Sequence, residues 1–179
     1  MNPRAAVIVQ PVAQFLAAFP TNVLFPIVVI LILKYHLNVN IWVTPLMLLG
    51  TQWYILFNVV AGASALPEDL KQATANFGVK GWQWWRHLIL PGIFPYWITG
   101  TLTAVGNCWN TSIIAEAVSW GSTTLVATGL GAYITQKSAL GDFPRVALGI
   151  AVMSVFVFLM NRLIWQPLYR LAQSRYKFD

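Results

Sequence analysis

Four strongly apolar runs of this chain contain no Lys, Arg, Asp or Glu, and they decide what it can fold into. The runs cover residues 5–33, 35–67, 87–115 and 146–161. A helix needs about 20 apolar residues to cross the hydrocarbon core of a bilayer, and the first three runs are longer than that. The fourth reaches this length if Arg145 and Arg162 extend their charged groups to the membrane surfaces. The pattern predicts an integral membrane protein.

Composition excludes the soluble classes. Only 9% of the 179 residues are charged, whereas soluble domains have about 25%. The net charge of +6 does not indicate nucleic-acid binding, because the basic residues follow the ends of the apolar runs instead of forming one patch. Residues 1–179 are expected to form one transmembrane domain in contact with the lipid bilayer.

Prolines and polar residues divide the apolar runs into helices. Pro11, Pro20 and Pro26 break the first run, which predicts a helix over residues 3–18 and a short span over 20–35. Longer spans are expected over 41–63, 91–115 and 143–163, which gives an all-α, polytopic helical bundle of about four spans. Residues 116–144 are rich in Gly, Ser and Thr, and their segment "TTLVATGLGAYITQ" indicates a short amphipathic or re-entrant helix.

The basic residues predict the orientation. Two spans separate the loop 66–90 from the tail 163–179, so both can lie on one side of the membrane. That side carries eight of the eleven basic residues, and the positive-inside rule makes it the cytoplasm. The opposite side, with the loop 116–144, is then external. The eight are Arg4, Lys71, Lys80, Arg86, Arg162, Arg170, Arg175 and Lys177; the other three are Lys34, Lys137 and Arg145.

The polar segment 66–91 is predicted to form two short helices around a glycine. In the first helix Leu70, Ala73 and Phe77 are spaced i, i+3 and i+7, which makes one apolar stripe. Gly78 follows at the position of a C-terminal cap that needs a positive φ. The second helix is expected to carry its own apolar stripe, formed by Trp82, Trp85, Leu88 and Ile89.

The stretch "QATANFGVKGWQWWRHLILP" resembles the EAA loop of ABC importer permeases, whose pattern is E-A-A, three residues, Gly, nine residues and I-x-L-P. The spacing matches throughout, although Gln72 replaces the acid and Thr74 replaces the second alanine. The segments "AEAV" and "TGLGAYI" and the tail "WQPLYRLAQSRY" are similar to the nitrate/sulfonate/taurine branch of these inner-membrane permeases. The resemblance therefore covers essentially the whole chain.

This resemblance implies a fold, a function and partners. The fold would be a type I ABC importer permease core in the cell inner membrane, with the EAA loop docked on a cytoplasmic ATPase. The other partners would be a second permease half and an extracytoplasmic solute-binding protein. The chain has no P-loop of its own, so it would not be an enzyme. The implied coupling residues are Leu70, Gln72, Ala73, Thr74, Phe77, Gly78, Leu88, Leu90 and Pro91.

Polar residues of the third span are the remaining site candidates. Thr99, Thr103 and Asn107 either line a polar path or pack helices together. Glu116 ends the same span and is either part of that path or a solvated or hydrogen-bonded helix terminus. No spacing of His, Cys or acidic residues indicates a metal site, a cofactor or catalytic residues.

One alternative function remains open from the residues. A secondary transporter or channel fragment would work without an ATPase, but it usually needs charges inside the membrane, and only Glu116 qualifies.

The resemblance implies a small anionic solute, of the nitrate, sulfonate or taurine type, without choosing among them. Since the family core has five or six spans, the chain is expected to be the C-terminal part of a longer or fused permease, or to need another chain.

Overall fold

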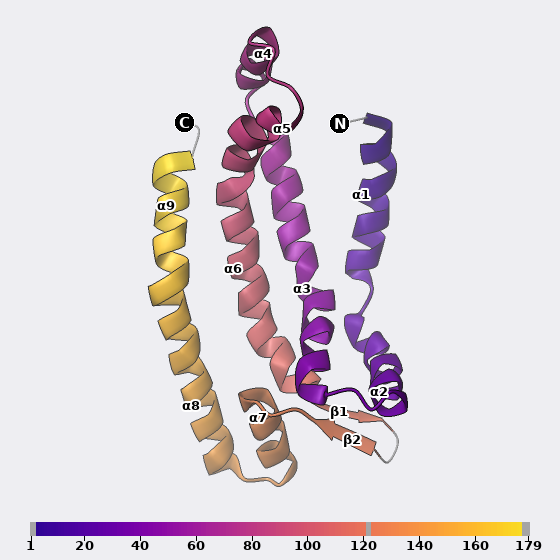
Figure 1. Cartoon of the computed structure of the whole chain (residues 1–179). Coiled ribbons are helices and arrows are strands. Elements are labelled where there is room, and N and C mark those ends of the chain that lie inside the picture. Colours follow the sequence, from indigo (N-terminus) through magenta and orange to yellow (C-terminus); the bar gives the residue numbers. More distant parts are fainter. Residues whose placement is uncertain (1–2, 121–122, 177–179) are drawn as a thin grey trace. The chain divides into compact units, whose positions relative to one another are not determined.

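The structure is a computed structural model that describes the backbone of residues 3–120 and 123–176. Helices dominate the described residues, as expected for a polytopic membrane protein, and one two-stranded hairpin interrupts them (Figure 1). The first half consists of α1 (Pro3–Ala18), the 3-10 helix η1 (Thr21–Leu24), α2 (Phe25–Lys34), α3 (Val39–Ser64), α4 (Glu68–Asn76), α5 (Gly81–Trp84) and the π-helical segment η2 (Trp85–Ile89). The second half consists of α6 (Leu90–Ala115), β1 (Ala117–Trp120), β2 (Thr123–Val126), α7 (Leu130–Ala139), α8 (Phe143–Met160), the π-helical segment η3 (Asn161–Trp165) and α9 (Gln166–Tyr176).

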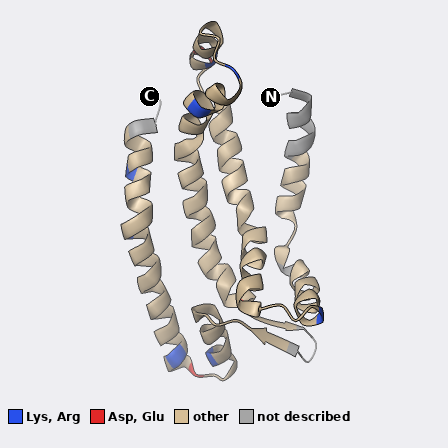
Figure 2. Ribbon diagram, viewed as in Figure 1, with Lys and Arg blue, Asp and Glu red and all other residues tan. Residues whose placement is uncertain are grey.

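Three helices of the described chain are long and apolar enough to cross a membrane. They are Val39–Ser64, Gly81–Ala115 and Phe143–Ser174, with 26, 35 and 32 residues. At about 1.5 Å per residue each is longer than the roughly 30 Å hydrocarbon core. Figure 2 shows α3 and α6 without a charged residue along their length. In contrast, α2 has ten residues, about half the required length, so the segment expected as a short span cannot cross alone.

Two of the long helices continue through a short π-helical segment. Pro91 was expected to begin a helix, and a separate second helix was expected in the loop before it. Both expectations are wrong, because Gly81–Ala115 runs unbroken through η2. Likewise, α8 continues through η3 into α9, where a tail was expected. Each π-helical segment ends two residues before a proline, Pro91 for η2 and Pro167 for η3. A proline ring clashes with the carbonyl four residues earlier, and the wider turn relieves that clash without ending the helix.

The chain forms two compact units, and the three long helices contribute to both. Unit 1 consists of Met1–Trp53 and Asn107–Val155, and unit 2 of Tyr54–Gly106 and Phe156–Asp179. In unit 1, Phe25 of α2, Leu46 of α3 and Ala115 of α6 form a buried cluster. This cluster holds the short helix α2 against the first half of α3.

Unit 1 also contains the hairpin, and here the prediction of helix for "TTLV" is wrong. These residues form β2, which pairs antiparallel with β1 so that Ala117 lies opposite Val126. Thr and Val are β-branched and favour a strand, so local preference agrees with this pairing. The remainder of the expected short helix is present as α7.

In unit 2, α3 and α6 approach closely at two glycines. A Cβ on Gly62 would lie 2.6 Å from Cγ of Tyr96, and one on Gly100 would lie 2.9 Å from the carbonyl oxygen of Tyr54. Both distances are below van der Waals contact, so a side chain at either position would separate the helices. Small residues are the usual means of close helix packing in membranes.

Candidate functional site

A buried cluster holds the base of the loop between α3 and α6. Leu66, Leu88 and Ile89 are 4%, 4% and 7% exposed and pack together, with Leu70 and Trp84 among the side chains against them. Leu66 follows α3, Leu70 belongs to α4, and the other residues lie at the start of the long helix Gly81–Ala115. We call Leu66, Leu88 and Ile89 the root cluster. Through Leu70 it fixes one face of α4.

The first turn of α4 follows the chemistry of a helix N-terminus. Pro67 precedes the helix, and Glu68 and Asp69 occupy its first turn, where negative charge complements the helix dipole. Lys71 Nζ lies 2.8 Å from Oε1 of Glu68. Because the glutamate side chain is 75% exposed, this ion pair contributes little to stability. The packing of Leu70 is therefore what fixes α4.

The C-terminus of α4 ends in the glycine cap that the sequence predicts. Gly78 has φ +67°, a left-handed conformation that costs other L-residues energy. Its amide donates to the carbonyl of Ala75 at 3.0 Å, and the Val79 amide donates to that of Thr74 at 2.9 Å. These two bonds form a Schellman motif. A Cβ on Gly78 would meet nothing within 4 Å, so backbone conformation alone calls for glycine here.

Large apolar side chains are exposed around this cap. Phe77 is 84% exposed, and Trp82 and Trp85 are 71% and 47% exposed. The stripe expected from Leu70, Ala73 and Phe77 therefore divides, since Leu70 packs on the root cluster and Phe77 faces outward. Exposed aromatic residues of this size are typical of interaction surfaces.

The other residues implied by the EAA pattern have mixed environments. Gln72 is exposed, whereas Ala73 and Thr74 are half-buried. The Thr74 hydroxyl lies within hydrogen-bond distance of the carbonyls of Leu70 and Lys71, at 3.0 and 2.9 Å, so this substitution for alanine is satisfied within the helix. At the end of the pattern Leu88 is buried, Leu90 is 44% exposed and Pro91 is half-buried.

The polar residues of α6 do not form one site. Thr99 and Thr103 are exposed, and their hydroxyls donate to the carbonyls of Pro95 and Thr99, both at 3.0 Å. Asn107 is half-buried and belongs to unit 1, as does Glu116, whereas the two threonines belong to unit 2. Of these four candidates, only Thr99 lines a cavity described for the chain.

Glu116 forms a contact that the sequence did not reveal. Its Oε2 accepts a hydrogen bond from the Ala132 amide at 3.0 Å, and Ala132 lies in the first turn of α7. Gly129, directly before α7, has no side chain with which to cap the helix. The Glu116 carboxylate takes that role from the turn between α6 and β1. Glu116 is therefore hydrogen-bonded, but to a different helix from the span whose end it was expected to form. The helix it caps is α7, and the carboxylate also meets favourable dipole charge there.

Gly129→Ala is expected to weaken the start of α7 by about 0.5–2 kcal/mol, the usual range for a lost cap. The added methyl would overlap the Glu116 carboxylate, while φ of −169° is extended and tolerates alanine. The effect should therefore disappear when Glu116→Ala has already removed the carboxylate. Hydrogen exchange at the Ala132 amide measures both variants and their combination. Additive effects of the two substitutions would contradict the contact.

Comparison with known proteins agrees with this architecture. Residues 1–165 match the family described as binding-protein-dependent transport system inner membrane component. The chain is 25% identical over 112 residues to the nitrate import permease protein NrtB of Leptolyngbya laminosa, covering 63% of this chain and 38% of NrtB. It is 29% identical over 136 residues to the putative aliphatic sulfonates transport permease protein SsuC of Escherichia coli K12, covering 72% and 50% of the two chains.

A third relative is the bicarbonate transport system permease protein CmpB of Synechococcus elongatus, 24% identical over 112 residues, with 63% of this chain and 38% of CmpB covered. The matches thus span between 38% and 50% of the length of these relatives. The family match covers nearly the whole chain, and the described helices have the length and composition of membrane spans. This chain therefore belongs to the family of binding-protein-dependent transport system inner membrane components, the permeases of ABC importers.

Proposed function

We propose that this chain is a translocation-pore subunit of an ATP-driven importer and that α4 is its contact with a cytoplasmic ATPase. One observation carries the proposal. Phe77 is 84% exposed and is held at the end of α4 by the left-handed Gly78 cap, within a loop that has the EAA spacing. An aromatic side chain displayed on a fixed helix suits insertion into a cleft of a partner protein.

The root cluster gives this contact a mechanical consequence. Leu70 ties α4 to Leu66, which follows α3, and to Leu88 at the start of the long helix Gly81–Ala115. A partner that displaces α4 therefore pulls on two long helices at once, because packed cores transmit displacement with little compression. ATP hydrolysis on the partner would in this way reach the membrane-spanning part of the chain.

Phe77→Ala is expected to weaken ATPase binding at least tenfold, which corresponds to about 1.4 kcal/mol, and buried aromatic anchors often contribute more. Phe143→Ala is the matched control, because Phe143 is also strongly exposed, at 74%, but begins α8. Co-purification of the ATPase with the assembled transporter measures the difference. Equal retention by both variants would refute α4 as the contact.

We further propose that the transported solute is a small anion. Relatives named for nitrate, aliphatic sulfonates and bicarbonate support this proposal, since all three are anions, whereas one further relative is named for an osmoprotectant. An extracytoplasmic solute-binding protein would deliver the solute, and a second permease half would complete the path. Stimulation of ATP hydrolysis by one candidate anion with its binding protein would identify the solute.

The loop 66–90 and the C-terminus are proposed to be cytoplasmic, and residues 116–144 external. If Gly81–Ala115 and Phe143–Ser174 each cross once, the loop and the C-terminus lie on one side, which carries most of the basic residues. Single cysteines at Asn76 and Ser138, both exposed, are expected to react with a membrane-impermeant maleimide from opposite sides. A Cys108→Ser background removes the native thiol. Reaction of both cysteines from one side would contradict this orientation.

A further inference from the structure

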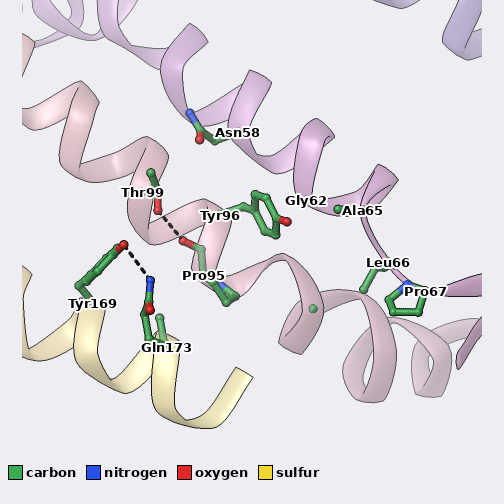
Figure 3. Close-up of a pocket in the computed structure, with 12 residues that line it drawn as sticks. Asn58, Gly62, Ala65, Leu66, Pro67, Pro95, Tyr96, Thr99, Tyr169 and Gln173 are labelled. Atoms are coloured by element: carbon green, nitrogen blue, oxygen red, sulfur yellow. Dashed lines mark hydrogen bonds between the residues drawn. The ribbon is translucent and has the colours of Figure 1, made fainter. Parts of the chain in front are cut away.

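Unit 2 contains a cavity of about 390 Å³ next to the loop. Its walls come from the second half of α3, the first half of α6 and α9 (Figure 3). This volume lies within the range of sites for small molecules, roughly 300–1,000 Å³. Of the lining residues, Leu66 and Pro67 matter most, because they connect α3 to α4.

Small residues create the space. Gly62, Ala65, Gly92 and Ala172 line the cavity, and none of them fills it with a side chain. The ring of Tyr96 forms one wall and packs directly on Gly62. The cavity therefore lies beside the close contact between α3 and α6.

The polar groups in the walls keep hydrogen-bonding capacity. The Tyr169 hydroxyl accepts a bond from Nε2 of Gln173 at 2.8 Å, and its own proton is still available to donate. Asn58 donates through Nδ2 to the Tyr54 carbonyl at 2.8 Å, which leaves its amide oxygen to accept. Figure 3 shows Tyr169 and Gln173 on α9 and Asn58 on α3, so a ligand would meet polar groups from two helices.

Charge is missing from these walls. Every residue that lines the cavity in the described part of the chain is uncharged. A charged ligand would lose its hydration here without meeting an opposite charge, which is costly. An uncharged molecule loses less, and its apolar body matches the Gly, Ala and Pro surfaces. We infer that this cavity binds a small uncharged amphipathic molecule with an aromatic or aliphatic body and one hydroxyl, amide or ring N–H group.

Binding would act on α4 through its first residues. Pro67 directly precedes the helix, and Leu66 belongs to the root cluster. A ligand against these two residues fills the space into which they would otherwise move, so α4 becomes less mobile when the cavity is occupied. Any resulting change in ATP hydrolysis rests on the proposed function, whereas binding and the immobilisation of α4 do not.

Indole is a suitable probe, because it is uncharged, fits the volume and carries one N–H donor; benzenesulfonate is its charged counterpart. We expect saturable indole binding to the assembled transporter in nanodiscs and at least tenfold weaker binding of benzenesulfonate. Ala65→Phe fills the cavity and should weaken indole binding at least tenfold. Ala61→Phe is the control, since Ala61 is exposed one turn earlier and does not line the cavity. Three results would overturn the site: indole binding that does not saturate, equal indole binding by Ala65→Phe and Ala61→Phe, or tighter binding of benzenesulfonate than of indole.

Removal of the free acceptor tests the site without filling it. Asn58→Leu keeps the size of the side chain but removes the amide oxygen that would accept from the indole N–H, and it should weaken indole binding several-fold. Asn110→Leu, exposed and outside the lining, should not. A spin label at Asn76→Cys reports on α4, and indole should reduce its mobility in the control and not in Ala65→Phe. Unchanged mobility at saturating indole would refute the effect on α4. Reduced mobility with unchanged ATP hydrolysis would uphold the inference and contradict the proposed ATPase contact.

Discussion

Gly78→Val is expected to uncouple ATP hydrolysis from transport while the chain still inserts into the membrane. The glycine has φ +67° and open space around it, so valine introduces backbone strain and no collision. A left-handed conformation costs an L-residue about 1–2 kcal/mol, and a β-branched residue is among the least tolerant. Because α4 has nine residues, and helices below about 12–15 are marginal alone, this strain should release the last turn that holds Phe77.

Two variants separate this effect from a general loss of glycine. Gly78→Asn should retain most of the coupling, since asparagine tolerates the left-handed conformation. Gly106→Ala, in α6, should behave like wild type, because its Cβ would meet nothing within 4 Å and its φ is not positive. The measurement is the ratio of solute transported to ATP hydrolysed in proteoliposomes. A wild-type ratio in Gly78→Val would show that coupling does not depend on the cap.

Leu88→Ala is expected to have the second large effect. Leu88 is 4% exposed in the root cluster, and removal of a buried leucine side chain typically costs 2–5 kcal/mol. Leu70 would lose part of its packing surface, so α4 would no longer hold a fixed position. The whole loop should then become sensitive to limited proteolysis, and ATPase retention should fall by at least tenfold.

Leu90→Ala is the matched control, because the two leucines lie in the same I-x-L-P pattern but Leu90 is 44% exposed. Its loss should leave the loop protected from proteolysis. Trypsin cleavage after Lys80 in the assembled transporter compares the variants directly. Similar cleavage rates for both would mean that the root cluster does not fix the loop.

Local signals made part of this architecture predictable. The helix over residues 3–18 agrees with α1, Pro3–Ala18, and the span expected over 41–63 agrees with α3, Val39–Ser64. The ends of these helices follow from signals a few residues away in the sequence, namely the ends of the apolar runs and the neighbouring prolines. The Gly78 cap was equally local, since glycine after a short amphipathic helix has few other roles.

Tertiary contacts account for the rest. The periodicity placed Leu70 and Phe77 on one stripe, but only packing shows that Leu70 is covered and Phe77 is exposed. Glu116 and the start of α7 are separated in sequence by the hairpin, so helical periodicity could not predict their contact. The continuous helix through Pro91 depends on the π-helical segment η2, which apolar periodicity does not indicate.

Cross-linking from α4 to the ATPase tests the central proposal most directly. The transporter would carry Asn76→Cys in a Cys108→Ser background and be assembled with its ATPase. The single thiol would be labelled with a benzophenone maleimide, and irradiation would insert the benzophenone into any C–H bond of a protein in contact with it. Asn76 is exposed at the end of α4, so a covalent product between the two chains is expected. Ser138→Cys, exposed in α7, should give none. No product from Asn76→Cys, or an equal yield from Ser138→Cys, would contradict the assignment of α4 as the ATPase contact.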